Sequence, residues 1–190
     1  MAAESNKSGT MHVSRFGFWI GVAVFLALAD QVTKWAVIEW LTYVEGDQIL
    51  YRTAKIYDPV LTILLQKNPG AAWGFLADQG GWQRYFFIAL ASGVSIAIVV
   101  WLYRIRAEGP LILQAGLAFV LGGAVGNLVD RIRSGEVTDF IQVRFAGMPG
   151  FDPFPSFNVA DAAITVGAAL LIIDALFFSG RAQQAPAEKE

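Results

Sequence analysis

Cysteine is absent from this 190-residue sequence, and histidine occurs once, as His12. The lack of cysteine excludes disulfides, thiolate metal sites and a cysteine nucleophile. A single histidine leaves no basis for a serine–histidine–aspartate triad or a histidine-rich zinc site. If the protein is a hydrolase, its chemistry must therefore rest on carboxylates.

Charged residues are also scarce, at 16% of the chain against about 25% in soluble domains. Hydrophobic residues make up 55%, and the mean hydropathy is +0.50. This composition is typical of a membrane protein. The net charge of −2 gives no reason to expect a nucleic acid as partner.

The apolar residues fall into four runs, each near the roughly 20 residues that a membrane-spanning helix needs. The expected spans are residues 16–41, 82–103, 111–129 and 158–178. They leave polar tails at 1–15, expected to be disordered, and at 179–190, with long loops at 42–81 and 130–157. We therefore predict an all-α membrane protein. One alternative is a cleavable signal sequence ending at Ala27–Ala29, but apolar residues resume after Lys34 and favour a retained helix.

The two long loops are predicted to carry the irregular and β structure. β-Branched and aromatic residues indicate short strands in 48–57, 60–66 and 137–143, with Asp58-Pro59 as a turn. The small and aromatic residues after Pro69-Gly70 favour a short amphipathic helix at the headgroup level. Four spans place both termini on one side, and Arg104 and Arg106 directly after a span favour the cytoplasm for that side.

This topology collects polar side chains at the membrane face that carries the long loops. They are Asp30, Lys34, Asn68, Asn127, Asp130, Asp139, Asn158 and Asp161. Scattered structural charges would occur at both faces, whereas ionisable groups gathered at helix ends indicate a functional site.

Asp139 and Asp161 are the candidate catalytic pair. Two neighbouring carboxylates share a proton and titrate as a coupled dyad. The ionised member can take a proton from an attacking water, and the protonated member can hydrogen-bond the amide carbonyl and help the amine to leave. Each has a plainer interpretation: Asp161 as the third helical residue after an Asn158 N-cap, and Asp139 as a solvated loop acid.

The other polar residues of this face are interpreted as support for the site. Asp30 and Lys34 are four residues apart and can pair on one helix face, and Asn127 and Asp130, three residues apart, share one face of a helix. Asp130 is expected to be structural, through capping and pairing with the adjacent Arg131. Asn68 either binds an extended peptide or forms an Asx turn. Small residues from Gly122 to Gly126 predict close helix packing.

Five motifs in order resemble those of the lipoprotein signal peptidase (type II signal peptidase) family, across residues 16–178. They are Asp30-Gln31-Val32-Thr33-Lys34, Asn68-Pro69-Gly70-Ala71-Ala72-Trp73, Gly122-Gly123-Ala124-Val125-Gly126-Asn127-Leu128-Val129-Asp130-Arg131, Val137-Thr138-Asp139-Phe140 and Phe157-Asn158-Val159-Ala160-Asp161. Each motif alone is weak, but the ordered set is specific. Trp73, where the family is expected to have phenylalanine, and Pro69 depart from the pattern.

The resemblance implies a bacterial inner-membrane aspartic endopeptidase that cuts a diacylglyceryl-modified prolipoprotein on the amino side of its lipidated cysteine. It implies four transmembrane helices, an extracytoplasmic β-cradle and a short amphipathic helix, with no metal or organic cofactor. Membrane lipid and cyclic peptide inhibitors of the globomycin type are implied partners, and we expect a monomer. Asp139 and Asp161 match the catalytic aspartates. The residues that match supporting or substrate-binding positions are Asp30, Lys34, Asn68, Gly70, Gly122, Asn127, Asp130, Arg131, Asn158 and Ala160.

Two other function classes remain open from the residues alone. A proton- or ion-coupled carrier would use Asp30, Lys34 and Asp130 as a relay, but a carrier places such charges near the bilayer midplane rather than at helix ends. A non-enzymatic assembly subunit would tolerate loss of both candidate aspartates.

Overall fold

The computed structural model describes residues 2–70, 81–107, 109–145, 147 and 152–178, with side chains from Arg15 onward. Within these residues lie four helices: α1 (Ala2–Leu41), α2 (Trp82–Arg104), α3 (Leu111–Arg133) and α4 (Val159–Phe177). Each holds a stretch long and apolar enough to cross a membrane, Arg15–Leu41 in the case of α1. The predicted class of four-helix membrane protein is therefore confirmed.

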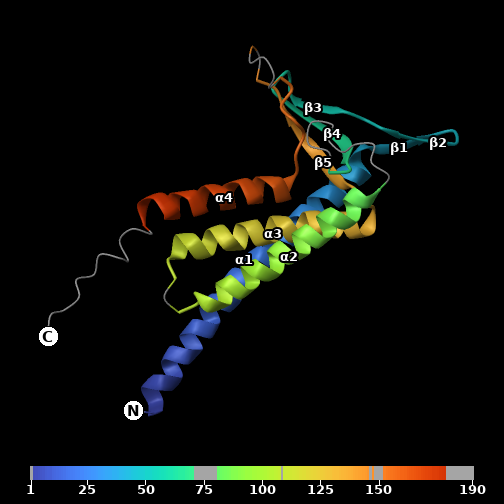
Figure 1. Ribbon diagram of the computed structural model, residues 1–190. Helices are drawn as coiled ribbons and strands as arrows, with labels where there is room; N and C mark the ends of the chain where they lie inside the picture. The colour runs from blue at the N-terminus through green and yellow to red at the C-terminus, as the bar shows by residue number, and fades with distance from the viewer. Residues whose placement is uncertain (1, 71–80, 108, 146, 148–151, 179–190) are drawn as a thin grey trace.

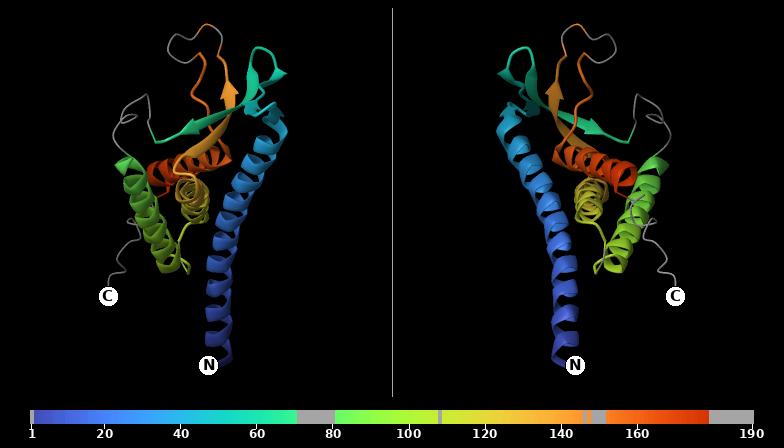
Figure 2. Two further views of the ribbon diagram at one scale, coloured as in Figure 1. Left: turned by 90° about the vertical axis from the view of Figure 1, so that its right-hand side faces the viewer. Right: turned by 90° about the vertical axis from the view of Figure 1, so that its left-hand side faces the viewer.

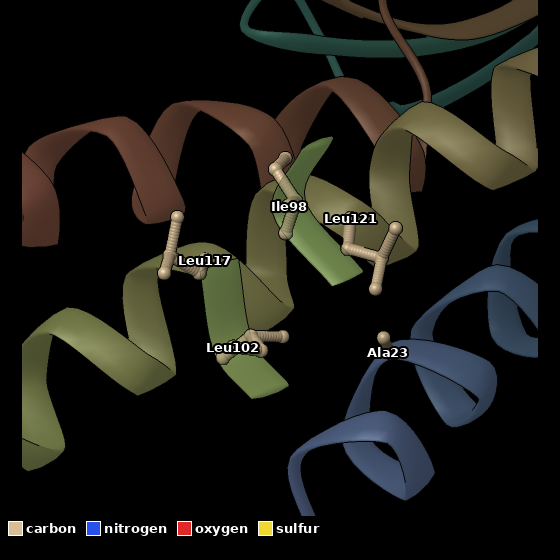
Figure 3. Packing of buried hydrophobic residues seen from close by; sticks show 5 residues of the cluster. All are labelled: Ala23, Ile98, Leu102, Leu117 and Leu121. Carbon is tan, nitrogen blue, oxygen red and sulfur yellow. The ribbon is translucent and has the colours of Figure 1, made fainter. Parts of the chain in front are cut away.

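Helix α3 is the centre of the bundle. Figure 2 shows it nearly end-on between α1 and α2, with α4 packed along its other side. Leu117 and Leu121 of α3 meet Ile98 and Leu102 of α2 and Ala23 of α1 in the apolar core (Figure 3). Large apolar side chains elsewhere on the helices face outward, as expected for surfaces in contact with lipid.

The small residues of α3 allow this close packing, as the sequence predicted. A Cβ on Gly122 would lie 2.7 Å from the Leu26 Cβ and 2.8 Å from the Ala23 carbonyl oxygen of α1. A Cβ on Gly126 would lie 3.2 Å from the Ala160 Cβ of α4. Real Cβ atoms essentially never lie within 3.0 Å of another heavy atom, and 3.2 Å is tighter than most real contacts. Glycine therefore sets how closely α1 and α4 approach α3.

Two small antiparallel sheets lie at one end of the bundle (Figure 1). The first pairs β1 (Thr42–Glu45) with β2 (Gln48–Tyr51), and the second has the order β3–β4–β5. Its strands are β3 (Ala54–Tyr57), β4 (Leu61–Asn68) and β5 (Val137–Val143). The β4–β5 register places Gln66 opposite Asp139 and Asn68 opposite Val137. The two long loops of the sequence are thereby joined into one structure.

The predicted strands are confirmed in part. Val137–Val143 is β5 as predicted, and the Asp58-Pro59 turn separates β3 from β4. The predicted strand 48–57 is instead two strands, and β4 continues two residues past Gln66 because it pairs there with β5. Strand β1 was not predicted. The expected amphipathic helix after Gly70 lies outside the described residues.

Two helix limits also differ from the prediction. The first fifteen residues were expected to be disordered, whereas α1 is continuous from Ala2, because extending an existing helix avoids the cost of nucleation. Helix α3 continues four residues past Val129 to Arg133, where basic residues in its last turn favour the helix dipole. Ala27–Ala29, the alternative cleavage site, lies within α1.

Candidate active site

The structure joins all eight predicted polar residues in one continuous network of hydrogen bonds and ion pairs. It runs from Asp30 through Lys34 to Asp130 and Asn127, and from Asn127 to Asp161 and Asn158. It then continues from Asn158 to Asp139 and Asn68. The expected convergence at one end of the bundle is confirmed.

Lys34 is the cation at the centre of this network. Its Nζ lies 2.8 Å from Asp30 Oδ2 and 2.8 Å from Asp130 Oδ2, and it donates to Asn127 Oδ1 at 3.0 Å. The ammonium is 3% exposed and Asp30 is fully buried. Lys34 therefore links α1 to Asp130 and Asn127 of α3. Removing one partner of such a buried ion pair typically costs about 3–5 kcal/mol of stability.

Asp130 contacts α1 and β5, with other partners than the predicted Arg131. Its Oδ2 pairs with Lys34 rather than with the adjacent Arg131 and accepts the Thr138 backbone N–H at 3.0 Å. Its Oδ1 accepts from Gln31 Nε2 at 2.8 Å. Lys34 displaces Arg131 as partner because both Asp130 and Lys34 face the α1–α3 interface. The carboxylate therefore ties the end of α3 to β5.

Asp30 makes the corresponding connection to α4. Its Oδ1 accepts the backbone N–H of Ala160 at 2.9 Å, in the first turn of that helix. Gly126 lies against the same carboxylate, since a Cβ there would be 2.8 Å from Asp30 Oδ2. The bond between Asp30 and Ala160 thus fixes the start of α4, which carries Asp161.

Asn127 links the lysine to the first candidate catalytic residue. Lys34 only donates hydrogen bonds, so the Asn127 oxygen must face it and the Asn127 amide nitrogen must face away. That nitrogen donates to Asp161 Oδ1 at 2.8 Å. The ammonium therefore orients Asn127, and Asn127 holds the Asp161 carboxylate.

Asn158 is the N-cap of α4 and also contacts both candidate aspartates. Its Oδ1 accepts from Asp161 N at 2.9 Å, and Asp161 Oδ2 accepts from Asn158 N at 3.2 Å, which completes a capping box. The Asn158 Nδ2 donates to Asp139 Oδ1 at 2.7 Å. The capping interpretation of Asp161 is confirmed, and it coexists with a position beside Asp139.

Asp139 lies in β5 and is 2% exposed, so its interpretation as a solvated loop acid was wrong. Its Oδ2 accepts from Asn68 Nδ2 at 3.0 Å. The pKa of Asp139 is raised to about 6, chiefly by burial and also by the nearby charge of Asp161, against the opposing effect of the hydrogen bonds from Asn68 and Asn158 and the charge of Lys34. A carboxyl with this pKa exchanges a proton near neutral pH.

Asn68 is held by the turn that follows β4. Its Oδ1 accepts the Gly70 N–H at 2.9 Å, which is the predicted Asx turn. Gly70 has φ +98°, a left-handed conformation that glycine adopts at no steric cost. With Oδ1 engaged there, the amide nitrogen of Asn68 is directed to Asp139. One side chain therefore serves both the turn and the site.

Two predicted site residues take different places. Gly122 lies against the α1 backbone, away from the polar network, so its role there is helix packing. The Arg131 guanidinium carbon lies 5.1 Å from the Phe87 ring centre, and Arg131 donates to the Asn127 carbonyl at 3.4 Å. The Arg131 side chain therefore packs against Phe87 of α2 and hydrogen-bonds the backbone of Asn127.

Three contributing residues were missed by the sequence analysis: Gln31, Thr138 and Lys67. Gln31 donates to Asp130, Thr138 donates its backbone N–H to Asp130, and Lys67 donates to Thr138 Oγ1 at 2.9 Å. Gln31 lies inside the motif that contains Asp30 and Lys34, so its polarity in an apolar run was an available signal. The contacts of Thr138 and Lys67 depend on strand pairing and had no such signal. Within the described parts of the chain, no group of three His, Cys, Asp or Glu could hold a metal ion.

Comparison with known proteins identifies relatives along most of the chain. Residues 22–177 match the family described as signal peptidase (SPase) II. The lipoprotein signal peptidase of Acinetobacter baumannii is 45% identical over 159 residues, covering 84% of this chain and 83% of that protein. That of Ectopseudomonas mendocina is 44% identical over 163 residues, covering 85% and 90%. A bacterial membrane enzyme solved by the in meso method at 1.9 Å resolution matches with TM-score 0.67 and 32% identity, covering 86% of this chain and 95% of its own.

Proposed function

Because the chain belongs to the signal peptidase II family and is thus a bacterial multi-pass membrane peptidase of lipoprotein signal peptides, we propose that it cleaves with an aspartate dyad, Asp139 and Asp161. Its substrate is a diacylglyceryl-modified prolipoprotein, cut on the amino side of the lipidated cysteine. The observation that carries the proposal is Asn158, which is hydrogen-bonded to both aspartates. Its side-chain amide donates to the β5 carboxyl of Asp139 and its backbone N–H donates to the α4 carboxyl of Asp161, so one residue contacts two carboxyls that are distant in sequence.

The two aspartates differ in surroundings, and this difference assigns their roles. Asp139 is buried and has a raised pKa, so it holds the shared proton and donates it to the oxygen of the scissile carbonyl. Asp161 is partly exposed and accepts hydrogen bonds from Asn127 and the Asn158 backbone, and we assign it the role of the base that takes a proton from water.

The reaction then follows ordinary general acid–base steps. The water oxygen bonds to the carbonyl carbon as its proton moves to Asp161, and Asp139 protonates the carbonyl oxygen. When the carbon–nitrogen bond breaks, the proton on Asp161 passes to the leaving amine and Asp139 regains its proton from the collapsing hydroxyl. The dyad returns to its starting state, and no residue other than the two aspartates takes part in the proton transfers.

The position of the site suits a lipid-anchored substrate. Asp139 lies in β5 and Asp161 in the first turn of α4, and the sheets stand at this end of the bundle (Figure 1). We place this end at the membrane surface. A cysteine held by acyl chains would keep the scissile bond at that level. We assign this face to the extracytoplasmic side of the inner membrane, with both termini cytoplasmic. The small sheets would act as a cradle for the extended peptide, and cyclic peptides of the globomycin type would compete for it. The enzyme acts as a monomer.

Cleavage of a lipidated prolipoprotein peptide by the purified protein tests the proposal. Asp139→Asn and Asp161→Asn should each lower the rate at least 10²- to 10⁴-fold, the range for loss of one general acid or base. Asp152→Asn is the matched control, because Asp152 pairs with Arg144 outside the network. The unlipidated peptide should be cut far more slowly. Near-normal cleavage by either dyad variant would refute the assignment of that aspartate to the dyad.

A further inference from the structure

An apolar groove of about 530 Å³ lies between α1 and α2. Both helices pack on α3 (Figure 2). Leu121, Val125 and Val129 of α3 form the floor of the groove. Ala27 and Leu28 of α1 line one wall. Apart from Gln31 and Ser95, every lining residue is aliphatic.

A second, polar pocket of about 350 Å³ begins where this groove ends. The two share Gln31, and the polar pocket continues past Trp35 to Lys67 and Arg133. Within it, Lys34 and Asp130 offset one another at 2.8 Å. No salt bridge within the described residues pairs a carboxylate with Lys67 or Arg133. Both of these side chains are exposed, so the pocket presents uncompensated positive charge.

The groove has the length of one lipid acyl chain. From Ile20 to Gln31 the α1 axis advances about 16 Å at 1.5 Å per residue, close to half of the roughly 30 Å hydrocarbon core. Trp35 lines the polar pocket, two helical turns beyond Leu28 on the same side of α1. It is 64% exposed, as is usual for tryptophan at the headgroup level. The apolar groove and the positively charged pocket therefore follow each other along α1 in the same order as the acyl chain and the headgroup of a lipid.

We propose that the groove and the pocket together bind one anionic glycerophospholipid of the surrounding bilayer. An acyl chain lies between α1 and α2, and the phosphate lies at Lys67 and Arg133. The uncompensated charge selects a phospholipid over a neutral diacylglyceryl group, which has no anion to place there.

This lipid site is separate from the dyad. Thr138 lines the polar pocket, whereas Asp139 contacts Asn158 and Asn68, and successive side chains of a strand point to opposite faces. The bound lipid would contact Gln31 and Lys34, which hold Asp130 in place. It would therefore brace the α1 side of the network without touching the proposed catalytic carboxyls.

Binding is tested with purified, delipidated full-length protein in detergent, titrated with phosphatidylglycerol and followed by native mass spectrometry. Phosphatidylcholine and diacylglycerol with the same acyl chains are the comparison ligands. Phosphatidylglycerol should bind most tightly, and Arg133→Gln should weaken it about fivefold, the effect of one cation at a membrane surface. Arg144→Gln, an exposed arginine outside both pockets, should leave the affinity unchanged.

The apolar half is tested by filling the groove. Val24→Trp places a large side chain in the groove from a position that is already 53% exposed, so folding should persist, and it should weaken binding of phosphatidylglycerol. Phe25→Trp, its outward-facing neighbour, should not. Equal affinity for phosphatidylglycerol and phosphatidylcholine would overturn the proposal, as would binding that is unchanged by Arg133→Gln or Val24→Trp. Diacylglycerol binding as tightly as phosphatidylglycerol would also overturn it and assign the groove to the substrate's glyceryl anchor. Because binding is measured directly, these outcomes do not depend on the cleavage assay.

Discussion

Asn158 combines helix capping with the arrangement of two carboxylates. Its side-chain oxygen caps α4 through Asp161 N, and its side-chain nitrogen contacts Asp139. The residue has no exposed surface, so the amide cannot rotate without leaving buried groups unpaired. At this position, stability of the helix start and geometry of the proposed dyad depend on the same side chain.

The two roles of Asn158 are separable by substitution. Asn158→Ala should lower the free energy of unfolding by about 2–4 kcal/mol, from a lost cap of about 1 kcal/mol and unpaired buried groups at about 1–3 kcal/mol. Asn158→Ser keeps a capping oxygen and should recover about 1 kcal/mol, but it is too short to reach Asp139. Cleavage should stay low in both variants. Denaturant unfolding and cleavage rates check this, and full activity in the serine variant would show that the bond to Asp139 is dispensable.

The raised pKa of Asp139 predicts a pH-dependent stability. The folded protein binds this proton more tightly than an ordinary aspartate of pKa 3.8, so the stabilisation is complete below about pH 4 and falls as pH rises through about 6. Two pKa units correspond to about 3 kcal/mol. Unfolding of the wild type in detergent should therefore become easier from pH 4 to pH 7 relative to Asp139→Asn, which has no such proton. Parallel curves for the two proteins would contradict the raised pKa.

Among the helices, the position of α3 is the most restricted, because it packs most extensively against the others. One face of it packs on α1 and another on α4, and its glycines allow both contacts. The same helix carries Asn127 and Asp130 in its C-terminal part, so its placement decides whether Lys34 can reach both. Close packing in the membrane and assembly of the polar network are therefore consequences of one helix position.

Gly126→Ala tests this coupling. The new Cβ would lie 2.8 Å from Asp30 Oδ2 and 3.2 Å from the Ala160 Cβ, so Asp30 or α4 must shift. Overpacking of this kind costs about 1–3 kcal/mol, and cleavage should fall with it. The matched control is Gly93→Ala on α2, where a Cβ meets nothing within 4 Å and helix propensity should add up to about 1 kcal/mol. Equal behaviour of the two variants would show that α3 tolerates displacement.

For the whole molecule, the described helices carry both sheets and the polar network at one end, and the α2–α3 connection at the other (Figure 1). Residues of the network come from α1, α3, α4, β4 and β5. If the bundle spans the membrane, the site must therefore lie on the side opposite to the α2–α3 connection.

The cysteine-free sequence makes this topology directly testable. Two single-cysteine variants are made. Asp47→Cys changes a residue in the turn between β1 and β2, and Ala107→Cys changes one in the α2–α3 connection. A membrane-impermeant maleimide should label the first in intact spheroplasts and the second only after permeabilisation, because Arg104 and Arg106 favour the cytoplasm for that connection. The unsubstituted protein should remain unlabelled. Labelling of both positions in intact spheroplasts would refute the opposed placement.

Local patterns predicted much of this architecture because they act over short distances along the chain. Apolar runs near 20 residues predicted the helices, and the i, i+4 spacing predicted the Asp30–Lys34 pair. Strand β5 and the Asx turn at Asn68 were equally local signals. The pairing of Asp130 with Lys34 instead of Arg131 was not predictable, because it depends on how α1 packs against α3.

By itself, the sequence determined the membrane class and the positions of the apolar helices, and it excluded a cysteine nucleophile and a histidine-based triad. Hydropathy and residue inventory are properties of the chain that folding does not alter. Only the tertiary structure decided that Asp139 is buried, that Asn158 contacts both aspartates, and that Lys34 orients Asn127 toward Asp161. Among these partners, the ones on different elements are 19 to 93 positions apart in the chain. They meet only when α1, β5 and α4 are brought beside α3, and no local pattern encodes contacts at such sequence separations.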